Sequence, residues 1–187
     1  MATIYQPSQW LIPDNSNTDK VGNYSFDLDG VDDYIGCGNI SALNGVTSAT
    51  WTGWFNRDAA GSFYMMSTWG TTSAELQFAP LQTATSLNVY MANSAGAQQI
   101  MFTHTSLTFT AGTWYHLAFV RASGSVKLYR DGVQKGSSID NATSLDPGGI
   151  SIGRDWSGAG GSYFSGYLDG FRITKGVARY TSGFTPP

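Results

Sequence analysis

One stretch near the start of the sequence carries the strongest structural signal: Tyr24-Ser25-Phe26-Asp27-Leu28-Asp29-Gly30-Val31-Asp32-Asp33-Tyr34-Ile35. Its apolar side chains Tyr24, Phe26 and Leu28 recur at every second position, which is the period of a strand that presents one face to a core. The Asp-Gly pair that follows favours a turn, because Asp and Gly both accept left-handed backbone angles. The stretch therefore predicts a β-hairpin whose second strand covers residues 31–35.

A similar pattern recurs near the other end, where residues 167–173 set a second Asp-Gly pair among apolar and aromatic residues. The two stretches look like matched parts of one domain. Between them, the β-branched and aromatic run Ala49–Phe55 predicts a central strand. Turn residues separate the further predicted strands, which are 63–69, 75–78, 87–91, 99–104, 113–121, 125–130, 133–137, 149–153 and 163–173. About a dozen short strands favour an all-β, two-sheet antiparallel sandwich.

The length of 187 residues suits one domain, and the composition, with 12% charged residues and 23 glycines, suits many short strands and tight turns. We expect a polar arm over residues 1–22, a sandwich over 23–175 and a tail over 176–187. Arg130-Asp131-Gly132-Val133 is the strongest hairpin signal, because a type I′ turn needs two residues with positive φ.

Charge and hydropathy exclude two classes of partner. The ten Lys and Arg are scattered and the net charge is −3, so no basic stripe is available for nucleic acid. No run approaches eighteen apolar residues and the start lacks the pattern of a secretory signal, so we expect no membrane segment. Cys37 is the single cysteine, which excludes an internal disulfide and favours a small apolar core residue.

Six motifs in order resemble the signature strands of laminin-G-like, concanavalin A-like jelly-roll domains. They are Leu28–Ile35, Thr50–Phe55, Thr113–Val120, Leu128–Gly132, Ile150–Gly153 and Phe164–Ile173. The resemblance covers roughly residues 23–175 and implies a jelly-roll sandwich. The tail 174–187 is similar to the ending of such domains in bacteriophage structural proteins, which implies a place in a virion.

The resemblance also implies a calcium ion where the first and last strands meet, and it nominates Asp29 and Asp169 as metal ligands. Calcium prefers six to eight oxygen ligands, so backbone carbonyls and water would have to complete the shell. An EF-hand does not fit, because Gly30 comes too early and Gly38 stands at the twelfth position. The alternative is that both aspartates serve only as turn formers.

Catalysis is the less favoured interpretation. A glycoside hydrolase needs two carboxyl groups flanking the bond, and Glu75 is the single glutamate of the chain. Asp32 and Asp33 are adjacent, which in a strand would send them to opposite faces. Residues 149–153 match Gly-x-Ser-x-Gly but alternate like a strand, without the strand-to-helix turn of a nucleophile elbow. His104 and His116 lie in strand-like runs and favour structural roles, so we expect a protein that is not an enzyme.

Binding remains the favoured function. Sugar sites combine an aromatic platform with a few polar groups on loops above a rigid sheet. The loop 154–163 offers Arg154, Asp155, Trp156 and Tyr163, and the run 68–72 offers Trp69. The alternative for the tryptophans is a place in the core or at its rim.

The sequence thus predicts a non-catalytic binding or structural module of a virion, such as a head fibre, decoration or tail-associated protein. Its expected partners are a host surface glycan or other virion proteins. The rival is a purely structural capsid or tail part without a glycan ligand, docked through the polar arm. A homo-oligomer is compatible with either reading, although no heptad pattern supports a trimer.

Overall fold

The computed structural model describes most of the sandwich and not the first residues of the chain. The described residues are 20, 24–38, 40–59, 64–69, 76–81, 86–92, 98–104, 107, 109–140, 149–154 and 163–187. For residues 68–69, 76–81, 86, 88–92, 98–104 and 139–140 the description covers the backbone alone.

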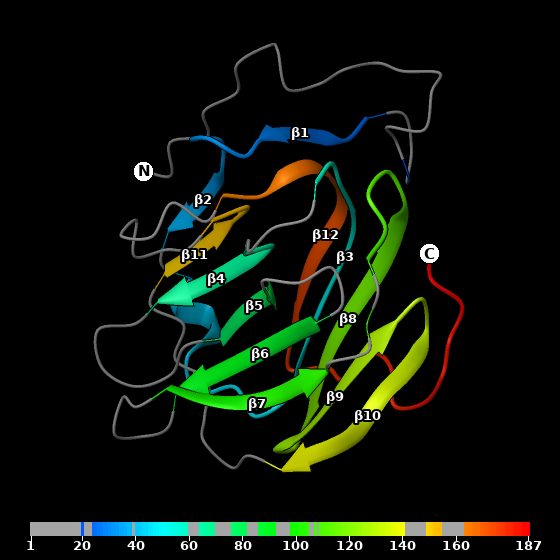
Figure 1. Cartoon of the computed structure of the whole chain (residues 1–187). Coiled ribbons are helices and arrows are strands. Elements are labelled where there is room, and N and C mark those ends of the chain that lie inside the picture. The colour runs from blue at the N-terminus through cyan, green and yellow to red at the C-terminus, as the bar shows by residue number, and fades with distance from the viewer. Residues whose placement is uncertain are drawn as a thin grey trace.

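Twelve strands form two antiparallel six-stranded sheets that face each other (Figure 1). Sheet A has the order β1 (Phe26–Asp29), β12 (Ser165–Lys175), β3 (Ala49–Arg57), β8 (Trp114–Ala122), β9 (Ser125–Arg130), β10 (Val133–Asp140). Sheet B has the order β2 (Ile35–Gly38), β11 (Gly149–Ile152), β4 (Met66–Trp69), β5 (Leu76–Leu81), β6 (Ser86–Ala92), β7 (Gln98–His104). The predicted all-β, two-sheet jelly-roll sandwich is confirmed.

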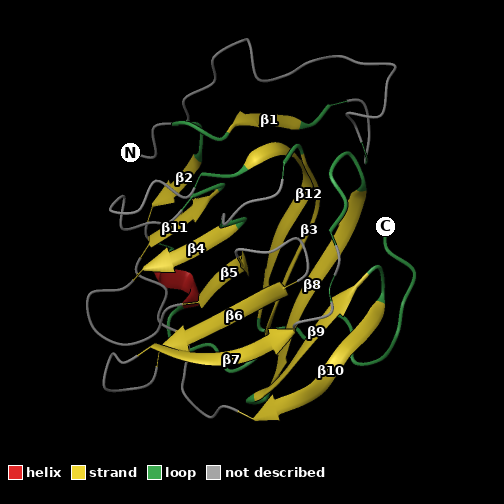
Figure 2. Cartoon of the chain, viewed as in Figure 1, coloured by secondary structure: helices red, strands yellow, loops and turns green. Residues whose placement is uncertain are grey.

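In the part of the chain that the structure describes, one 3-10 turn, η1 (Ser41–Leu43), lies between β2 and β3 (Figure 2). Within the described residues no helix is long and apolar enough to cross a bilayer.

The first stretch is not the predicted hairpin. β1 pairs with β12 in sheet A, whereas β2 pairs with β11 in sheet B, so the turn after Asp29 carries the chain from one sheet to the other. The alternation is also weaker than predicted, because Leu28 is fully buried while Tyr24 and Phe26 are 51% and 36% exposed. β1 is an edge strand of sheet A, and only its last apolar side chain reaches the core.

The two ends of the domain do pair, as their matched sequences predict, with Phe26 opposite Leu168. The second Asp-Gly pair is not a turn, however, because β12 runs through it. The register against β3 shifts between Asp169 and Arg172, and Gly170 has a φ of 57°. This bulge is a local irregularity in one long strand. The hairpin predicted at 130–133 is confirmed, with φ of 54° at Asp131 and 76° at Gly132.

The core lies between the sheets, on the inward faces of the central strands. Trp51 and Phe55 of β3 are buried with Phe119 of β8, Met66 of β4 and Ile150 of β11. Residues 149–153 form β11 and the position after it, which confirms that the Gly-x-Ser-x-Gly match is an ordinary strand. Cys37 is half-buried beside this core, and burial raises the pKa of its thiol.

The outward face of sheet A carries a second, smaller cluster. Ala118, Val120 and Tyr129 are buried there under Tyr180 and Phe184. These two aromatic residues belong to the segment 177–187, which we call the strap. The strap follows β12 and crosses β3, β8 and the β9–β10 turn, as its hydrogen bonds to Thr50, Lys127 and Gly132 show.

Candidate functional site

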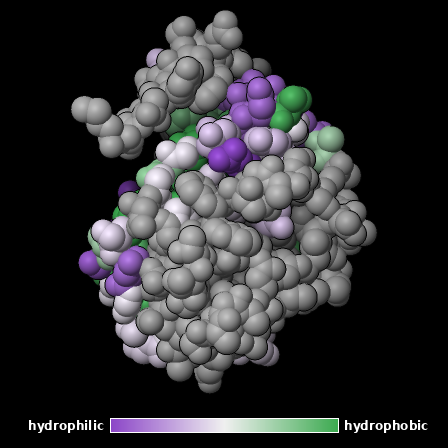
Figure 3. Space-filling model, turned by 90° about the vertical axis from the view of Figure 1, so that its left-hand side faces the viewer, coloured by the Kyte–Doolittle hydropathy of each residue, from purple (hydrophilic) through white to green (hydrophobic). Residues whose placement is uncertain are grey.

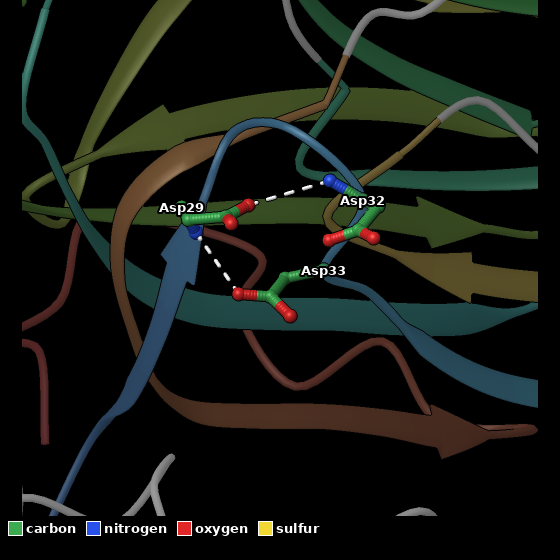
Figure 4. A group of neighbouring side chains, drawn as sticks. All are labelled: Asp29, Asp32 and Asp33. Carbon is green, nitrogen blue, oxygen red and sulfur yellow. Dashed lines mark hydrogen bonds between the residues drawn. The ribbon is translucent and has the colours of Figure 1, made fainter.

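The turn between β1 and β2 brings three carboxylates together. Asp29 Oδ1 accepts hydrogen bonds from the backbone N–H groups of Val31 at 2.7 Å and Asp32 at 3.3 Å, while Asp33 Oδ2 accepts one from Asp29 N at 3.2 Å (Figure 4). Carboxylate oxygens of Asp29, Asp32 and Asp33 lie within 4.8 Å of one another. The expectation that Asp32 and Asp33 point to opposite faces of a strand is wrong, because this segment is a turn.

Two further carboxylates extend this group onto sheet A. Asp58 Oδ2 accepts a hydrogen bond from Ser165 Oγ at 3.3 Å, and Asp58 N donates to Ser165 O at 3.1 Å. Partial burial raises the pKa of Asp27, and the negative charges of Asp58, Asp33 and Asp29 raise it further. We call Asp27, Asp29, Asp32, Asp33 and Asp58 the acidic end. Concentrated negative charge of this kind is stabilised by a cation or by hydroxyl donors.

A row of four residues on the outward face of sheet A adjoins the acidic end. Asp27 of β1 pairs with Tyr167 of β12, Tyr167 with Asn56 of β3, and Asn56 with Trp114 of β8. Paired residues in a sheet share a face, so these four side chains lie side by side. Tyr167 and Trp114 are half-buried. Asn56 is 5% exposed, and its Oδ1 is buried without a hydrogen-bond partner.

Sheet B contributes a cation and an aromatic ring at the same end. The Arg154 guanidinium lies 3.4 Å from the centre of the Tyr34 ring, and its Nε donates to Ser151 Oγ at 3.4 Å. Gly153 packs the chain closely here, because a Cβ at this position would meet Leu28 Cδ1 at 2.5 Å and Asp33 O at 3.7 Å. The predicted ligand residue Arg154 and the predicted metal residue Asp29 therefore lie at one end of the sandwich.

The remaining predicted binding residues are only partly located. Tyr163 is half-buried and precedes Phe164, whose N–H donates to Gly153 O at 2.8 Å, so Tyr163 also belongs to this end. Asp155 and Trp156 lie outside the described residues. Trp69 pairs with Gly149 at the far end of β11 from Arg154, and its side chain is outside the described set.

The structure does not bring the two predicted metal ligands, Asp29 and Asp169, together. Asp29 lies opposite Ser165, and Asp169 is four residues further along β12, which is about 13 Å at the rise of a strand. Asp169 is 8% exposed beside Trp54, where its Oδ2 accepts a hydrogen bond from Lys20 N at 2.9 Å. The misleading signal was the similarity of two Asp-Gly pairs, one of which is a bulge.

Sequence reasoning missed Asp27, Asp58, Tyr167 and Asn56 as members of a site. No motif connects them, because strand pairing and not chain proximity brings them together. Sequence reasoning could have found Asp32 and Asp33, with Tyr34 beside them, because Asp-Gly-x-Asp-Asp is rich in turn formers and a turn brings its carboxylates together.

The histidines are consistent with structural roles where they are described. His116 is 1% exposed, and burial lowers its pKa to about 4, although the nearby Asp131 carboxylate opposes this shift. Its ring meets Trp54 edge-on at a centroid distance of 5.1 Å. The side chain of His104 lies outside the described set.

Two antiparallel sheets that pack face to face, with the first and last strands paired in one of them, define a concanavalin A-like jelly roll. The chain belongs to the concanavalin A-like lectin/glucanases superfamily, because the family model of the laminin G type matches residues 29–179. None of the curated protein sequences matches the chain significantly.

Solved structures with the same fold come from diverse proteins. Domain 4 of the arabinanase AbnA from Geobacillus stearothermophilus, solved with arabinotriose, is 20% identical with a TM-score of 0.68, covering 85% of this chain and 73% of that one. The enzymatically active domain of tailspike protein 2 of bacteriophage CBA120 is 15% identical with a TM-score of 0.62, covering 88% and 27%. The CBM40 of a Ruminococcus gnavus sialidase, solved with α2,3-sialyllactose, is 11% identical with a TM-score of 0.54, covering 81% and 90%. At these identities the likeness shows the fold alone.

Proposed function

We propose that this chain is a non-catalytic glycan-binding module of a virion, and that the sugar is held at the acidic end. The observation that carries the proposal is the row Asp27, Tyr167, Asn56 and Trp114, in which the Tyr167 ring lies between a carboxylate and an amide and the Trp114 ring lies beside the amide. Aromatic rings suit the apolar face of a sugar, and the acceptors suit its hydroxyl groups. The arabinotriose complex of the arabinanase domain, which shares this fold, supports the idea with a neutral sugar.

The charge of the site selects among glycans. Asp27, Asp29, Asp33 and Asp58 are close enough for three of them to raise the pKa of Asp27. A ligand that brings another carboxylate would be repelled, whereas hydroxyl groups donate hydrogen bonds to carboxylates. The site therefore favours neutral sugars over sialic or uronic acids.

Replacing Tyr167 with alanine is expected to weaken binding of the preferred neutral glycan by about tenfold, through loss of the stacking surface. The measurement is a glycan-array screen on the purified chain, followed by titration calorimetry with the best neutral ligand. Tyr24→Ala is the matched control, because Tyr24 is an exposed tyrosine outside the row. Equal losses in both variants, or a clear preference for anionic sugars, would contradict this placement of the site.

We propose that calcium binds at the turn through Asp29, Asp32 and Asp33, rather than through Asp29 and Asp169. Three hard carboxylate oxygens suit calcium, and carbonyls and water would complete its shell. Calcium at about ten times its Kd is expected to stabilise the chain by about 1.4 kcal/mol, and magnesium to give less. Thermal unfolding of the native chain and of Asp33→Asn measures this, and an identical calcium response in the two proteins would refute the site.

A non-catalytic role fits the exposure of these acids. A glycoside hydrolase keeps one carboxylic acid protonated in a cleft beside a second carboxylate. Asp29 and Asp32 are exposed to solvent, and the carboxylates of Asp29 and Asp33 accept hydrogen bonds from backbone N–H groups of the turn. Glu75 lies outside the described residues.

The virion assignment is supported by the tailspike domain that shares this fold and by the phage-like ending of the chain. One observation favours the rival, a structural virion part without a glycan ligand. Tyr24, Phe26 and Val31 are 51%, 36% and 70% exposed, and they follow the arm directly. In Figure 3 an apolar group of atoms adjoins hydrophilic residues near the top of the face shown. If Tyr24→Ala and Phe26→Ala abolish incorporation into particles while glycan binding is absent, the structural role is the correct one.

A further inference from the structure

The strap fills a groove on the outward face of sheet A. The floor of the groove is formed by residues of three neighbouring strands that are at most 9% exposed: Trp54, His116, Ala118, Val120 and Tyr129. Without the strap these aromatic and apolar side chains would form an exposed patch, which is a surface suited to a partner.

One aromatic side chain of the strap fits into this groove. The ring of Phe184 meets His116 and Tyr129 edge-on, at centroid distances of 5.6 and 5.5 Å, and stacks on Tyr180 at 3.6 Å. Phe184 N donates to Gly132 O at 3.0 Å, and any Cβ on Gly132 would lie 1.7 Å from Phe184 O. The groove therefore accommodates the backbone of the strap at Phe184 as well as the Phe184 ring.

The other attachments of the strap are separate hydrogen bonds rather than a strand ladder. Thr50 Oγ1 donates to Val177 O and accepts from Arg179 N, Lys127 Nζ donates to Thr181 O, and Trp54 Nε1 donates to Pro187 O. Because no strand ladder ties residues 177–187 to sheet A, the strap can leave the groove without breaking the pairing of any strand.

Two further features make the strap separable from the sandwich. His116 Nδ1 and Tyr129 Oη are buried beneath it without a hydrogen-bond partner, so docking leaves two polar atoms desolvated that water would satisfy once the strap leaves. The link to β12, residues 175–177, is exposed, and Gly176 has a φ of 72° with no atom within 4 Å of the position its Cβ would take. One backbone hydrogen bond, from Gly176 N to Ser48 O at 2.9 Å, holds this link to the sandwich.

We propose that the strap exchanges between copies of this chain, so that the groove of one copy binds residues 177–187 of a second copy. The strap of a second copy fits this groove because it has the same sequence as the strap that fills the groove within one chain. Exchange preserves every contact listed above and leaves the sandwich unchanged. Reciprocal exchange closes a two-fold dimer.

The tether sets the conditions under which exchange is visible. A short flexible link keeps the strap of a chain near the groove of the same chain, at an effective concentration in the millimolar range. The strap of a second copy therefore competes for that groove only when the protein itself is at a similar concentration. Exchange is therefore expected in crowded assemblies such as a particle surface, and in solution at about 1 mM.

The first test is a mixed-copy cross-link in full-length chains that carry Cys37→Ala. One copy bears Lys127→Cys and the other Thr181→Cys, and a short bis-maleimide joins the two thiols, because the Lys127 side chain spans the gap to Thr181 O. A chain with both substitutions is the geometric control and is expected to form an intramolecular cross-link. After mixing at about 1 mM and cross-linking, a covalent heterodimer is expected. An intramolecular cross-link in the control together with no heterodimer in the mixture would overturn the proposal.

The second test does not depend on the geometry of a cross-link. A full-length Phe184→Ala chain lacks the ring that fills its own groove, and a labelled peptide of residues 177–187 is expected to bind it saturably in fluorescence anisotropy. The Phe184→Ala peptide is expected to bind at least tenfold more weakly, and adding Gly132→Ala to the chain to abolish binding. If Phe184→Ala does not fold, Tyr180→Ala serves as the acceptor chain. A folded acceptor that ignores the native peptide refutes exchange.

Discussion

Replacing Gly132 with alanine is expected to lower the free energy of unfolding by about 3–4 kcal/mol. About 1–2 kcal/mol comes from placing a Cβ at a φ of 76°. The remainder arises because the new Cβ would lie 1.7 Å from Phe184 O, so the strap must leave and the buried surface around Phe184 is lost, at about 2 kcal/mol for one Phe side chain. Urea unfolding followed by intrinsic fluorescence measures the loss.

The control for this experiment is Gly112→Ala. Gly112 has a φ of 73°, but no atom lies within 4 Å of the position its Cβ would take, so only the backbone cost of about 1–2 kcal/mol applies. The difference between the two variants isolates the contribution of the strap to stability. Equal losses of unfolding free energy in the two variants would mean that the strap does not stabilise the folded state. That result would contradict the assignment of the groove as a binding surface.

The strands were predictable from sequence because their signals are local. Alternating apolar residues, β-branched runs and Asp-Gly turns predicted the hairpin at Arg130–Val133 and the strand around Ser151, and both are present. The same local signals failed at Asp29–Gly30. A turn that joins two strands of one sheet and a turn that crosses to the opposite sheet use the same residues, and only the global pairing of β1 with β12 distinguishes them.

The candidate site was predictable only where chain neighbours build it. The family resemblance nominated Asp29 and the composition of the loop nominated Arg154, and the structure places both residues at one end of the sandwich. The row of Asp27, Tyr167, Asn56 and Trp114 was not predicted, since its members come from four strands spread over residues 27–167 of the chain, and register alone aligns them. The role of Phe184 was not predicted for the same reason, because its contacts with His116 and Tyr129 join residues that are far apart in the sequence.

Protonation of His116 is expected to cost the fold about 3 kcal/mol as the pH falls from 7 to 3.5. Burial under Phe184 and against Trp54 lowers its folded pKa to about 4, whereas the unfolded chain titrates near the ordinary value of 6.5. Between these two values the unfolded chain binds the proton first, so stability declines with falling pH at about 1.4 kcal/mol per pH unit. Above pH 7 this contribution does not change.

Charged neighbours modulate this titration without reversing it. The Asp131 carboxylate, which accepts a hydrogen bond from His116 N at 2.9 Å, favours the protonated ring and so opposes part of the effect of burial on the pKa. Urea unfolding at intervals from pH 7.5 to 3.5 is expected to show the decline in the native chain and in His104→Gln, and to lose it in His116→Gln. Carboxylates titrate in all three proteins, so only the difference reports on His116. If the stability of the His116→Gln chain declined with falling pH as much as that of the native chain, protonation of other groups would cause the loss. Proton uptake by His116 beneath the strap would then not weaken the docking of the strap.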